Sequence, residues 1–468
     1  MRIKLLDLYH GLPSSLRSAA ATGHGAYLRW WRYGARTNSL CAEALRRDDW
    51  TAEQWQKWRE ERLAYLLDRA ARRVPYYKRH WSERRRLGDR ASWDLLANWP
   101  ILEKDILRAN AADFVADDRS VSRMFHDHTS GTSGKSLDLW LSRDTVQAWY
   151  ALFEARCRQW NGVARHDRWA IIGGQLIAAV NQATPPFWAW NASLHQLYLS
   201  AYHLAPRHIA SYINALRRYR VRYIVGYPSA LHTLAREALR QRLDVPSLAF
   251  ILTNAEPLLP GQRVEIEEAF GCPVRETYGM AEIVAGASEC SEGRMHIWPE
   301  LGEIELIGGN GADGGVGELV CTGLLNDDMP LIRYRVGDRG SIAATGESCA
   351  CGRKLPILTS IEGRVDDVLL TADGRVVGRL DPVFKSGLPI LEAQIIQDAL
   401  NVIRIRYVPA EGFSAASRES LVDRVRERLG AVKVVLEELD AIPRTANGKF
   451  RAVICNLSPE ERAGAQSF

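Results

Sequence analysis

The chain has 468 residues, of which 46% are hydrophobic and 25% are charged. These fractions lie near the averages for soluble globular proteins and exclude a disordered or fibrous chain. The length predicts at least two domains, because single cores rarely grow beyond roughly 250 to 300 residues. The 61 basic and 56 acidic residues leave a formal charge of +5 with no long run of either sign, so nothing indicates a nucleic-acid partner.

The N-terminal part shows no segment typical of membrane insertion. No apolar run approaches the roughly 20 residues of a membrane span, and residues 1–17 lack a sustained hydrophobic signal segment, so we expect a cytoplasmic protein. The stretch RWWRYGAR, from Arg29 to Arg36, allows a weak peripheral contact with acidic lipid headgroups, although such stripes more often pack beneath a neighbouring helix. The sequence does not distinguish a monomer from a homodimer.

A long helix is predicted from Thr51 to about Val74. Thr51 and Gln54 fit a capping box, and apolar residues recur at helical spacing between them and Pro75, which ends the pattern. From about residue 168 to 360, the apolar runs RWAIIGG, YIVGYP, AFILTNAE and GELVCTG alternate with helical or polar stretches. This alternation predicts layered α/β structure.

The pattern of apolar and polar residues changes after about residue 363. VIRIRYVP and VKVVLEEL are typical of strands, and Leu421, Val422, Val425 and Leu429 share one helical face between them. We therefore expect an α/β fold with a large N-terminal domain over residues 1–363 and a small, mobile α+β lid domain over residues 364–468.

The strongest single motif is HDHTSGTSGKS, from His126 to Ser136. Its glycines let backbone N–H groups approach an anion, and its hydroxyls and the Lys135 ammonium add donors, so the motif predicts a phosphate-binding loop. It is not the P-loop of NTPases, which requires glycine where this chain has Thr129. Judged alone, an ordinary surface loop rich in serine and glycine is the alternative.

Three further segments follow in order: TYGMAE (277–282), DMPLIRYRVGD (328–338) and PRTANGK (443–449). Together with TSGTSGK they resemble the ordered motifs of the acyl-adenylate-forming enzymes. Within that superfamily the chain resembles, over nearly its whole length, the phenylacetate-coenzyme A ligase branch and in particular its capsular-polysaccharide-biosynthesis type. The closer resemblance is carried by LPSSLRSAAATGHGAYLRWWRYG, RVPYY, RYRVGDRG, CACGR, GRLDPVFKSG, EAQIIQ and IPRTANGKFRAVI.

The resemblance implies a site for MgATP. Glu282 would bind Mg²⁺, Tyr278 would stack on adenine, and Asp338 would accept hydrogen bonds from both ribose hydroxyls. The β and γ phosphates would be held by Thr129, Ser130, Gly131, Thr132, Ser133, Gly134 and Lys135, with Thr132 as the assisting hydroxyl. Further nucleotide contacts are implied for Asn254, Ala255, Glu256, Thr277, Gly279 and Met280. Without the resemblance, the alternatives are a solvated helix-start carboxylate for Glu282, a core tyrosine for Tyr278 and a turn aspartate for Asp338.

The C-terminal part carries three more residues with implied roles. Lys449 would bridge the reacting carboxylate and the α-phosphate, a task that suits a point charge on a flexible stem. Arg364 would contact ATP or pyrophosphate, and Asp366 occupies the hinge about which the small domain would rotate. Read alone, Lys449 is a surface lysine, and Arg364 and Asp366 form an interdomain ion pair.

The acid-binding pocket is expected at three loops that follow predicted strands, because open α/β sheets bind ligands at strand ends. The loops are GGQ, GYPSA and TNAEP, which contribute Gly173, Gly174, Gln175, Gly226, Tyr227, Pro228 and the residues after Thr253. Tyr227 suits a flat or extended acid, and core packing explains it equally well. The identity of the acid is not readable.

A second site is predicted from cysteine spacing. Cys290, His296, Cys349 and Cys351 form a Cys₃His set in polar, turn-rich sequence, which is typical of a structural Zn²⁺ site with no open position. Reduced loop thiols and a surface histidine are the alternative. The other cysteines, including Cys157 and Cys321, are expected in the core.

The sequence thus predicts an AMP-forming ligase. MgATP and a small-molecule carboxylic acid would give an acyl-adenylate and pyrophosphate, and the acyl group would pass to coenzyme A or another thiol, or to an amine, in polysaccharide or secondary-metabolite biosynthesis. One rival is a non-catalytic nucleotide-binding homologue that acts as a scaffold in polysaccharide assembly, although Lys449, Glu282 and Asp338 argue against it. A P-loop NTPase is disfavoured by Thr129.

Overall fold

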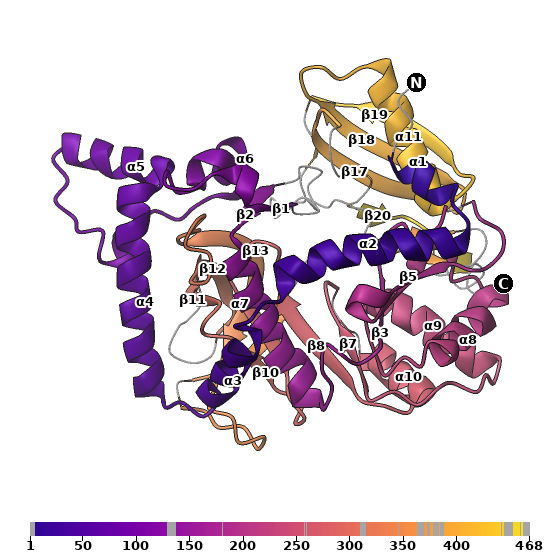
Figure 1. Cartoon of the computed structure of the whole chain (residues 1–468). Helices are drawn as coiled ribbons and strands as arrows, with labels where there is room; N and C mark the ends of the chain where they lie inside the picture. The colour runs from indigo at the N-terminus through magenta and orange to yellow at the C-terminus, as the bar shows by residue number, and fades with distance from the viewer. Residues whose placement is uncertain are drawn as a thin grey trace.

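The computed structural model of the chain describes residues 5–128, 137–179, 181–256, 258, 260–308, 315–344, 346–362, 369–371, 375–377, 383, 388–440, 442–443, 453–458 and 460–461. None of the helices in these ranges is long and apolar enough to cross a membrane. Figure 1 shows a broad body of strands and helices, a C-terminal sheet above it, and two N-terminal helices that extend to one side.

Five helices form the N-terminal region. The predicted helix after Thr51 is confirmed as α4, and its capping box is complete: Gln54 N–H donates to Thr51 Oγ1 at 3.3 Å, and Thr51 N–H donates to Gln54 Oε1 at 2.9 Å. Pro75 ends α4, and its fixed φ suits the first turn of α5. The helices are α1 (Leu5–His10), α2 (Ser14–Arg32), α3 (Thr37–Arg47), α4 (Ala52–Arg73) and α5 (Pro75–Arg86).

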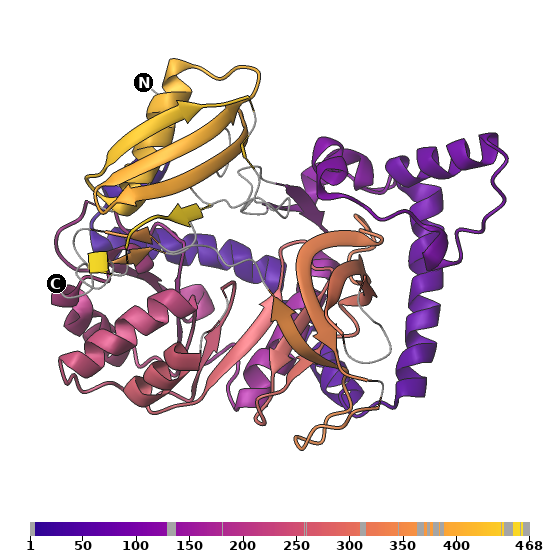
Figure 2. The same ribbon diagram turned by 180° about the vertical axis from the view of Figure 1, so that it is seen from behind.

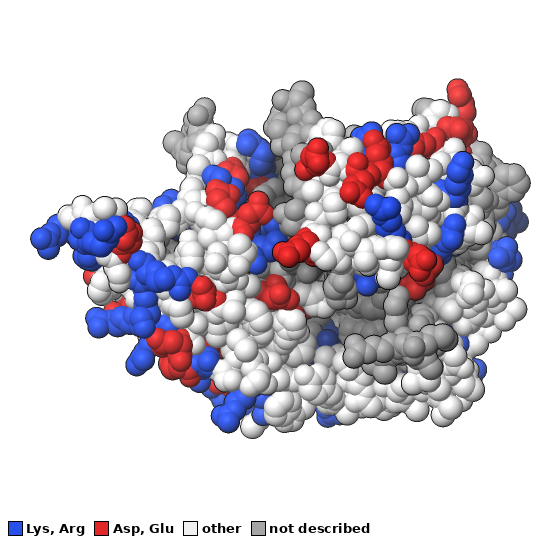
Figure 3. Space-filling model, turned by 90° about the horizontal axis from the view of Figure 1, so that it is seen from above, with Lys and Arg blue, Asp and Glu red and all other residues white. Residues whose placement is uncertain are grey.

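Helices α4 and α5 stand away from the body in Figure 1 and Figure 2. Lys and Arg side chains gather at this end of the molecule, with Asp and Glu among them (Figure 3). Lys78 pairs with Asp117 at 2.8 Å and Arg79 pairs with Asp113 at 2.6 Å. This end therefore presents paired charges rather than a continuous basic patch.

A twelve-stranded sheet forms the centre of the body, in the order β11-β12-β13-β14-β10-β9-β8-β7-β6-β3-β5-β4. Strands β5, β3, β6, β7 and β8 are parallel, β4 pairs antiparallel at one edge, and the strands from β8 to β11 are antiparallel. The parallel strands are β3 (Trp169–Gly173), β5 (Gln196–Ser200), β6 (Tyr223–Gly226), β7 (Phe250–Thr253) and β8 (Val274–Gly279). The others are β4 (Trp188–Asn191), β9 (Gly286–Glu289), β10 (Met295–Ile297), β11 (Gly302–Ile307), β12 (Gly317–Gly323), β13 (Tyr334–Ile342) and β14 (Ile357–Glu362).

Helices cover both faces of the parallel strands, which explains why their apolar runs are uninterrupted. Ile224 and Ile251 pack into a core with α8 (Ile209–Arg218), α9 (Pro228–Arg240) and α10 (Pro260–Phe270). Their neighbours Val225 and Leu252 point to the opposite face, where they pack with α7 (Arg143–Phe153) and with Trp31 of α2. The predicted α/β layering is confirmed.

Two short elements lead into α7. Strand β1 (Phe125–His128) pairs antiparallel with β2 (Asp138–Leu141), so that His128 faces Asp138 across the hairpin. Ser142 then caps α7, because its side chain accepts a hydrogen bond from the N–H of Thr145. The short helix α6 (Lys104–Ala109) precedes this hairpin along the chain.

The C-terminal part is a separate α+β unit, as predicted. Its sheet has the order β19-β18-β17-β20, and Leu421, Val425 and Leu429 of α11 pack on it. The predicted strands VIRIRYVP and VKVVLEEL are confirmed as β18 and β19. The elements are β15 (Leu369–Leu370), β16 (Val376–Val377), β17 (Ile390–Ala399), β18 (Val402–Pro409), α11 (Ala415–Leu429), β19 (Lys433–Glu438) and β20 (Val453–Cys455). The predicted boundary at residues 363 and 364 lies outside the described residues.

Candidate active site

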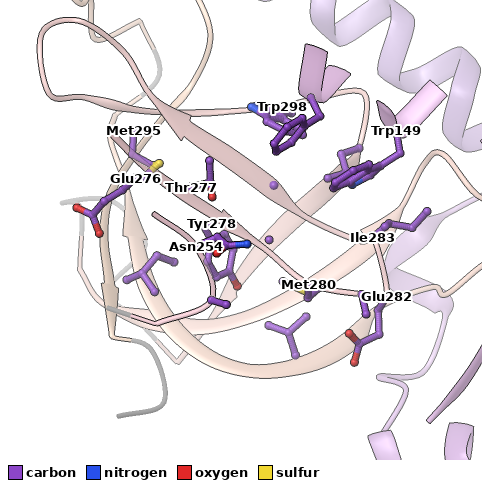
Figure 4. Close-up of a pocket in the computed structure, with 18 of the residues that line it drawn as sticks. Trp149, Asn254, Glu276, Thr277, Tyr278, Met280, Glu282, Ile283, Met295 and Trp298 are labelled. Atoms are coloured by element: carbon purple, nitrogen blue, oxygen red, sulfur yellow. The ribbon is translucent and has the colours of Figure 1, made fainter. Parts of the chain in front are cut away.

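A cavity of about 1090 Å³ opens in the body of the molecule. Segments that follow β7 and β8 form its floor, β13 borders it, and α2 and α7 contribute one wall. Figure 4 shows Trp149 and Trp298 on one side beside Ile283, Glu276 and Met295 on the opposite side, and Tyr278 between them. We call the lining from β8, the segment after it and β13 the polar side, because it contains Glu282 and Asp338, and the lining from α2 and α7 the apolar side, because it contains Trp31, Trp149 and Phe153.

Tyr278 and Asp338 meet in the cavity although 60 positions separate them. Tyr278 is the second-to-last residue of strand β8, and its hydroxyl donates to Asp338 Oδ2 of β13 at 2.9 Å. Burial raises the pKa of Tyr278, and the neighbouring carboxylate raises it further. Tyr278 therefore stays a neutral hydrogen-bond donor, and Asp338 has its carboxylate oriented in the cavity.

Glu282 is the most enclosed carboxylate of the predicted set, with 8% of the residue exposed. Its Oε1 accepts hydrogen bonds from Lys104 Nζ at 3.0 Å and from the Tyr334 hydroxyl at 2.8 Å. Burial alone would raise the pKa of Glu282, but the Lys104 ammonium and the hydrogen bonds outweigh it and hold the pKa below its ordinary value. Glu282 is therefore ionised, and Lys104 balances its charge.

Two residues of the cavity have left-handed backbone conformations without being glycine. Ala255 has a φ of 71° and Ile283 has a φ of 49°, and both line the cavity. A β-branched residue rarely adopts this conformation, because its side chain crowds the backbone. Such strain persists where the surrounding structure fixes it, and it is common at binding sites.

The structure brings together all of the predicted nucleotide residues that it describes. Beside Tyr278, Glu282 and Asp338, the cavity is lined by Asn254, Ala255, Glu256, Thr277, Gly279 and Met280. Residues 129–135, Arg364, Asp366 and Lys449 lie outside the described residues. Asp127 and His128, which directly precede the predicted phosphate loop, line the cavity.

The residues predicted for the acid pocket are close to one another and beside the cavity. Tyr227 N–H donates to the carbonyl of Ile172 at 3.0 Å, and Asn254 N–H donates to the carbonyl of Gly226 at 3.1 Å. An added Cβ at Gly173 would be 3.4 Å from the Tyr227 ring. Gly173, Gly174, Gln175, Gly226, Tyr227 and Pro228 are not among the residues that line the cavity.

The apolar side of the cavity was not found from the sequence. It is lined by Leu28 and Trp31 of α2, by Trp149 and Phe153 of α7, and by Ile283, Trp298 and Leu301. Trp149 and Phe153 lie one helical turn apart, so the helical spacing in the sequence could have predicted that they share one face of α7. Lys104 was missed as well, because a lone lysine at the start of a short helix carries no pattern.

Cys290, His296, Cys349 and Cys351 form one cluster, with all four possible ligand atoms within 4.8 Å of one another. Cys290 Sγ lies 3.7 Å from Cys349 Sγ, and His296 Nε2 lies 3.3 Å from Cys351 Sγ. His296 Nδ1 lies 3.3 Å from the carbonyl oxygen of Leu355, which leaves Nε2 directed at the thiols. This donor set fits a closed Zn²⁺ site. Cys157 and Cys321 are buried, as predicted.

The cluster ties together neighbouring strands on the polar side. Cys290 follows β9, His296 belongs to β10, and the two remaining cysteines precede β14, the next strand in the sheet. Glu289, Gly293 and Met295 of this segment line the cavity. A metal held here would therefore stiffen one wall of the cavity.

Comparison with known proteins gives two family matches. Residues 99–310 match the family described as AMP-binding enzyme, and residues 369–456 match the CapK C-terminal domain. Protein CapK of Staphylococcus aureus is 26% identical over 370 residues, which cover 76% of this chain and 80% of that protein. Phenylacetate-coenzyme A ligase of Thermus thermophilus is 30% identical over 275 residues, which cover 51% of this chain and 61% of that protein.

Solved structures share the fold. A 2-hydroxyisobutyryl-CoA ligase crystallised with its acyl-adenylate and CoA matches with a TM-score of 0.55 and 23% identity, over 88% of this chain and 91% of that one. The same enzyme in its postadenylation state gives a TM-score of 0.52 over 90% of this chain. The chain is thus similar to AMP-forming ligases of the adenylate-forming superfamily, near the phenylacetate-coenzyme A ligase branch.

Proposed function

We propose that the protein activates a small carboxylic acid with ATP, releases pyrophosphate and transfers the acyl group from the acyl-adenylate to an acceptor. The observation that carries the proposal is the convergence of Tyr278 and Glu282 from one motif, and Asp338 from another, on one cavity with a polar and an apolar side. A nucleotide and an acid need such a pair of neighbouring environments, because the two must meet at the α-phosphate.

Each polar residue has a proposed task. Asp338 accepts hydrogen bonds from the ribose, for which its oriented carboxylate is suited, and the Tyr278 ring provides a face for adenine. Glu282 would hold Mg²⁺, which favours carboxylate oxygen and would neutralise phosphate charge when bound. Thr129 to Lys135, Arg364 and Lys449 complete the proposed site with cations and N–H donors rather than a base, because the attacking carboxylate is already an anion.

We propose coenzyme A as the acceptor, on the similarity to phenylacetate-coenzyme A ligases. The C-terminal unit would rotate about Asp366 between adenylation and acyl transfer. An amine on a sugar or another small molecule is the second candidate, on the resemblance to capsule-type proteins that also underlies the CapK match, and the reaction would then belong to polysaccharide assembly. Analysis of the product formed with each acceptor separates the two.

We also propose that Cys290, His296, Cys349 and Cys351 hold one Zn²⁺. Four protein ligands leave no open coordination position, so the ion would be structural. Elemental analysis of the purified protein tests this directly, with one zinc per chain as the expected result.

The decisive experiment is acid-dependent exchange of labelled pyrophosphate into ATP across a panel of carboxylic acids. Exchange with at least one acid supports adenylation, because the reverse reaction requires an enzyme-bound acyl-adenylate. Silence across a broad panel, together with measurable ATP binding, would favour the non-catalytic scaffold instead. Release of phosphate rather than pyrophosphate would indicate an ordinary NTPase.

A further inference from the structure

Four cationic side chains line the cavity among the described residues. Three of them have carboxylate partners, in the pairs Lys104–Glu282, Arg263–Glu276, Arg263–Glu289 and Arg294–Glu347. The fourth is Arg32, the last residue of α2, which forms no ion pair with the carboxylates of the described residues. Arg32 therefore differs from the other cations of this cavity.

The surroundings of Arg32 are aromatic. Its guanidinium carbon lies 4.6 Å from the centre of the Tyr150 ring, and Trp31, Trp149 and Phe153 line the same side of the cavity. The ring face stabilises the charge, but a guanidinium carries five N–H donors that a ring leaves largely unused. A half-buried cation in an apolar wall is costly unless it finds an acceptor.

Asp127 is a carboxylate of the cavity lining whose charge acts on Tyr150, the ring that Arg32 contacts. It lines the cavity, and its Oδ1 accepts a hydrogen bond from the N–H of His128 at 2.8 Å. Arg32 and Asp127 both act on the phenol of Tyr150, in opposite directions, while burial raises the pKa of that phenol most. Asp127 is thus close to Tyr150, but its carboxylate accepts a hydrogen bond from the neighbouring backbone N–H of His128. It forms no ion pair with Arg32.

We propose that Arg32 binds a second anionic group of the acid substrate, so that the protein selects acids with a carboxylate at one end, an apolar spacer and another carboxylate or comparable anion at the other. This inference rests on the proposed function. The reacting carboxylate must lie at the nucleotide, near Glu282, and the apolar walls accept the spacer. The planar fork of arginine matches a carboxylate with two parallel hydrogen bonds.

The test compares matched acids in the pyrophosphate exchange assay: adipate with hexanoate, and phenylenediacetate with phenylacetate. The wild type should favour the diacid in kcat/KM by about tenfold to a hundredfold, the range for a charge-assisted hydrogen bond. Arg32→Met should remove this preference without changing the KM for ATP. Arg29→Met is the matched control, because Arg29 is exposed one turn earlier on α2 and does not line the cavity.

The outcomes are distinguishable from those that test the proposed function. Exchange with monoacids alone, or an unchanged diacid preference in Arg32→Met, overturns this inference and leaves adenylation intact. A raised KM for ATP with unchanged acid preference also overturns it, because Arg32 would then contact phosphate. Absence of exchange with every acid refutes adenylation and this inference with it. Should Arg32→Met fail to melt cooperatively, Arg32→Lys is measured instead. The lysine ammonium lacks the planar guanidinium, so this variant should keep only part of the preference for the diacid.

Discussion

The two sides of the cavity are built in different ways. The polar side consists of short segments after β7 and β8 and one strand, β13, and its carboxylates Glu282 and Asp338 already have hydrogen-bond donors. The apolar side is assembled from α2 and α7, whose lining residues Trp31 and Trp149 are more than a hundred positions apart in the sequence. The groups proposed to bind the nucleotide and Mg²⁺ are thus concentrated in short motifs, while the residues of the wall proposed to select the acid are far apart in the sequence.

The largest expected effect concerns the metal cluster behind the polar side. Cys349→Ser should lose the zinc and lower the melting temperature, because a structural zinc site contributes about 10 kcal/mol or more of binding free energy. Calorimetry and elemental analysis measure both. Cys455→Ser is the control, since Cys455 lies in the C-terminal sheet away from the cluster. A metal-free wild type with an unchanged melting temperature in Cys349→Ser would refute a structural role.

The next effect separates chemistry from acid selection. Glu282→Gln keeps acceptors for Lys104 and Tyr334 but removes the charge proposed to hold Mg²⁺. We expect acid-dependent exchange to fall on the order of a hundredfold, as when one electrostatic partner of a transition state is lost. Glu303→Gln serves as control, because Glu303 pairs with Arg59 outside the cavity. Normal exchange in Glu282→Gln would show that the polar side is not where the phosphates react.

A smaller change should affect nucleotide binding and leave the acid side alone. In Asp338→Asn the side chain still accepts from Tyr278 but gives up its charge and half of its acceptor capacity. The KM for ATP should rise about tenfold, in line with loss of a charged hydrogen bond, with the KM for the acid unchanged. Steady-state kinetics with each substrate varied in turn measures this. A rise in the KM for the acid alone would show that Asp338 contacts the acid rather than the nucleotide.

A substitution on the apolar side should have the opposite pattern and affect the acid rather than ATP. Trp149→Ala enlarges the wall where α7 faces the cavity, so the KM for the acid should rise by roughly fivefold to tenfold through lost apolar burial. The KM for ATP should stay constant. Trp30→Ala, an exposed tryptophan of α2 that does not line the cavity, is the control. Equal effects on both substrates would mean that the two sides are not separable.

The smallest effect is on the pH dependence of stability. The pKa of Glu282 is lower in the folded chain than its ordinary value of 4.5, so ionised Glu282 stabilises the fold above about pH 4.5. That contribution is lost as the pH falls through the folded-state pKa. The difference in unfolding free energy between wild type and Glu282→Gln should therefore shrink as the pH is lowered below about 4.5. A difference that stays constant over this range would show that Lys104 does not favour the carboxylate in solution.

Much of the fold could be predicted because its signals are local. The capping box at Thr51, the uninterrupted apolar runs of the parallel strands and the alternation of β18 each express one physical requirement within a few residues. The polar residues of the site were accessible for the same reason, since Tyr278 and Glu282 share one motif and Asp338 ends another.

The remainder of the site depends on tertiary packing. Trp31, Trp149 and Trp298 read individually as core residues, and only the meeting of α2, α7 and the segment after β10 makes them one wall. The glycines Gly173 and Gly226 at strand ends were predicted for an acid pocket, and in the structure Gly173 lies against Tyr227 while Gly226 lies against Ile172 and Leu231. No spacing rule in one sequence distinguishes these two uses.

The position of α2 has a consequence for how such ligases diversify. The region that matches the AMP-binding family begins at residue 99, whereas Leu28, Trp31 and Arg32 precede it by about seventy positions and still line the cavity. Mutations in this leading helix can therefore reshape the chamber without touching the residues proposed for the nucleotide. Two chains with nearly the same nucleotide motifs can in this way come to accept quite different acids.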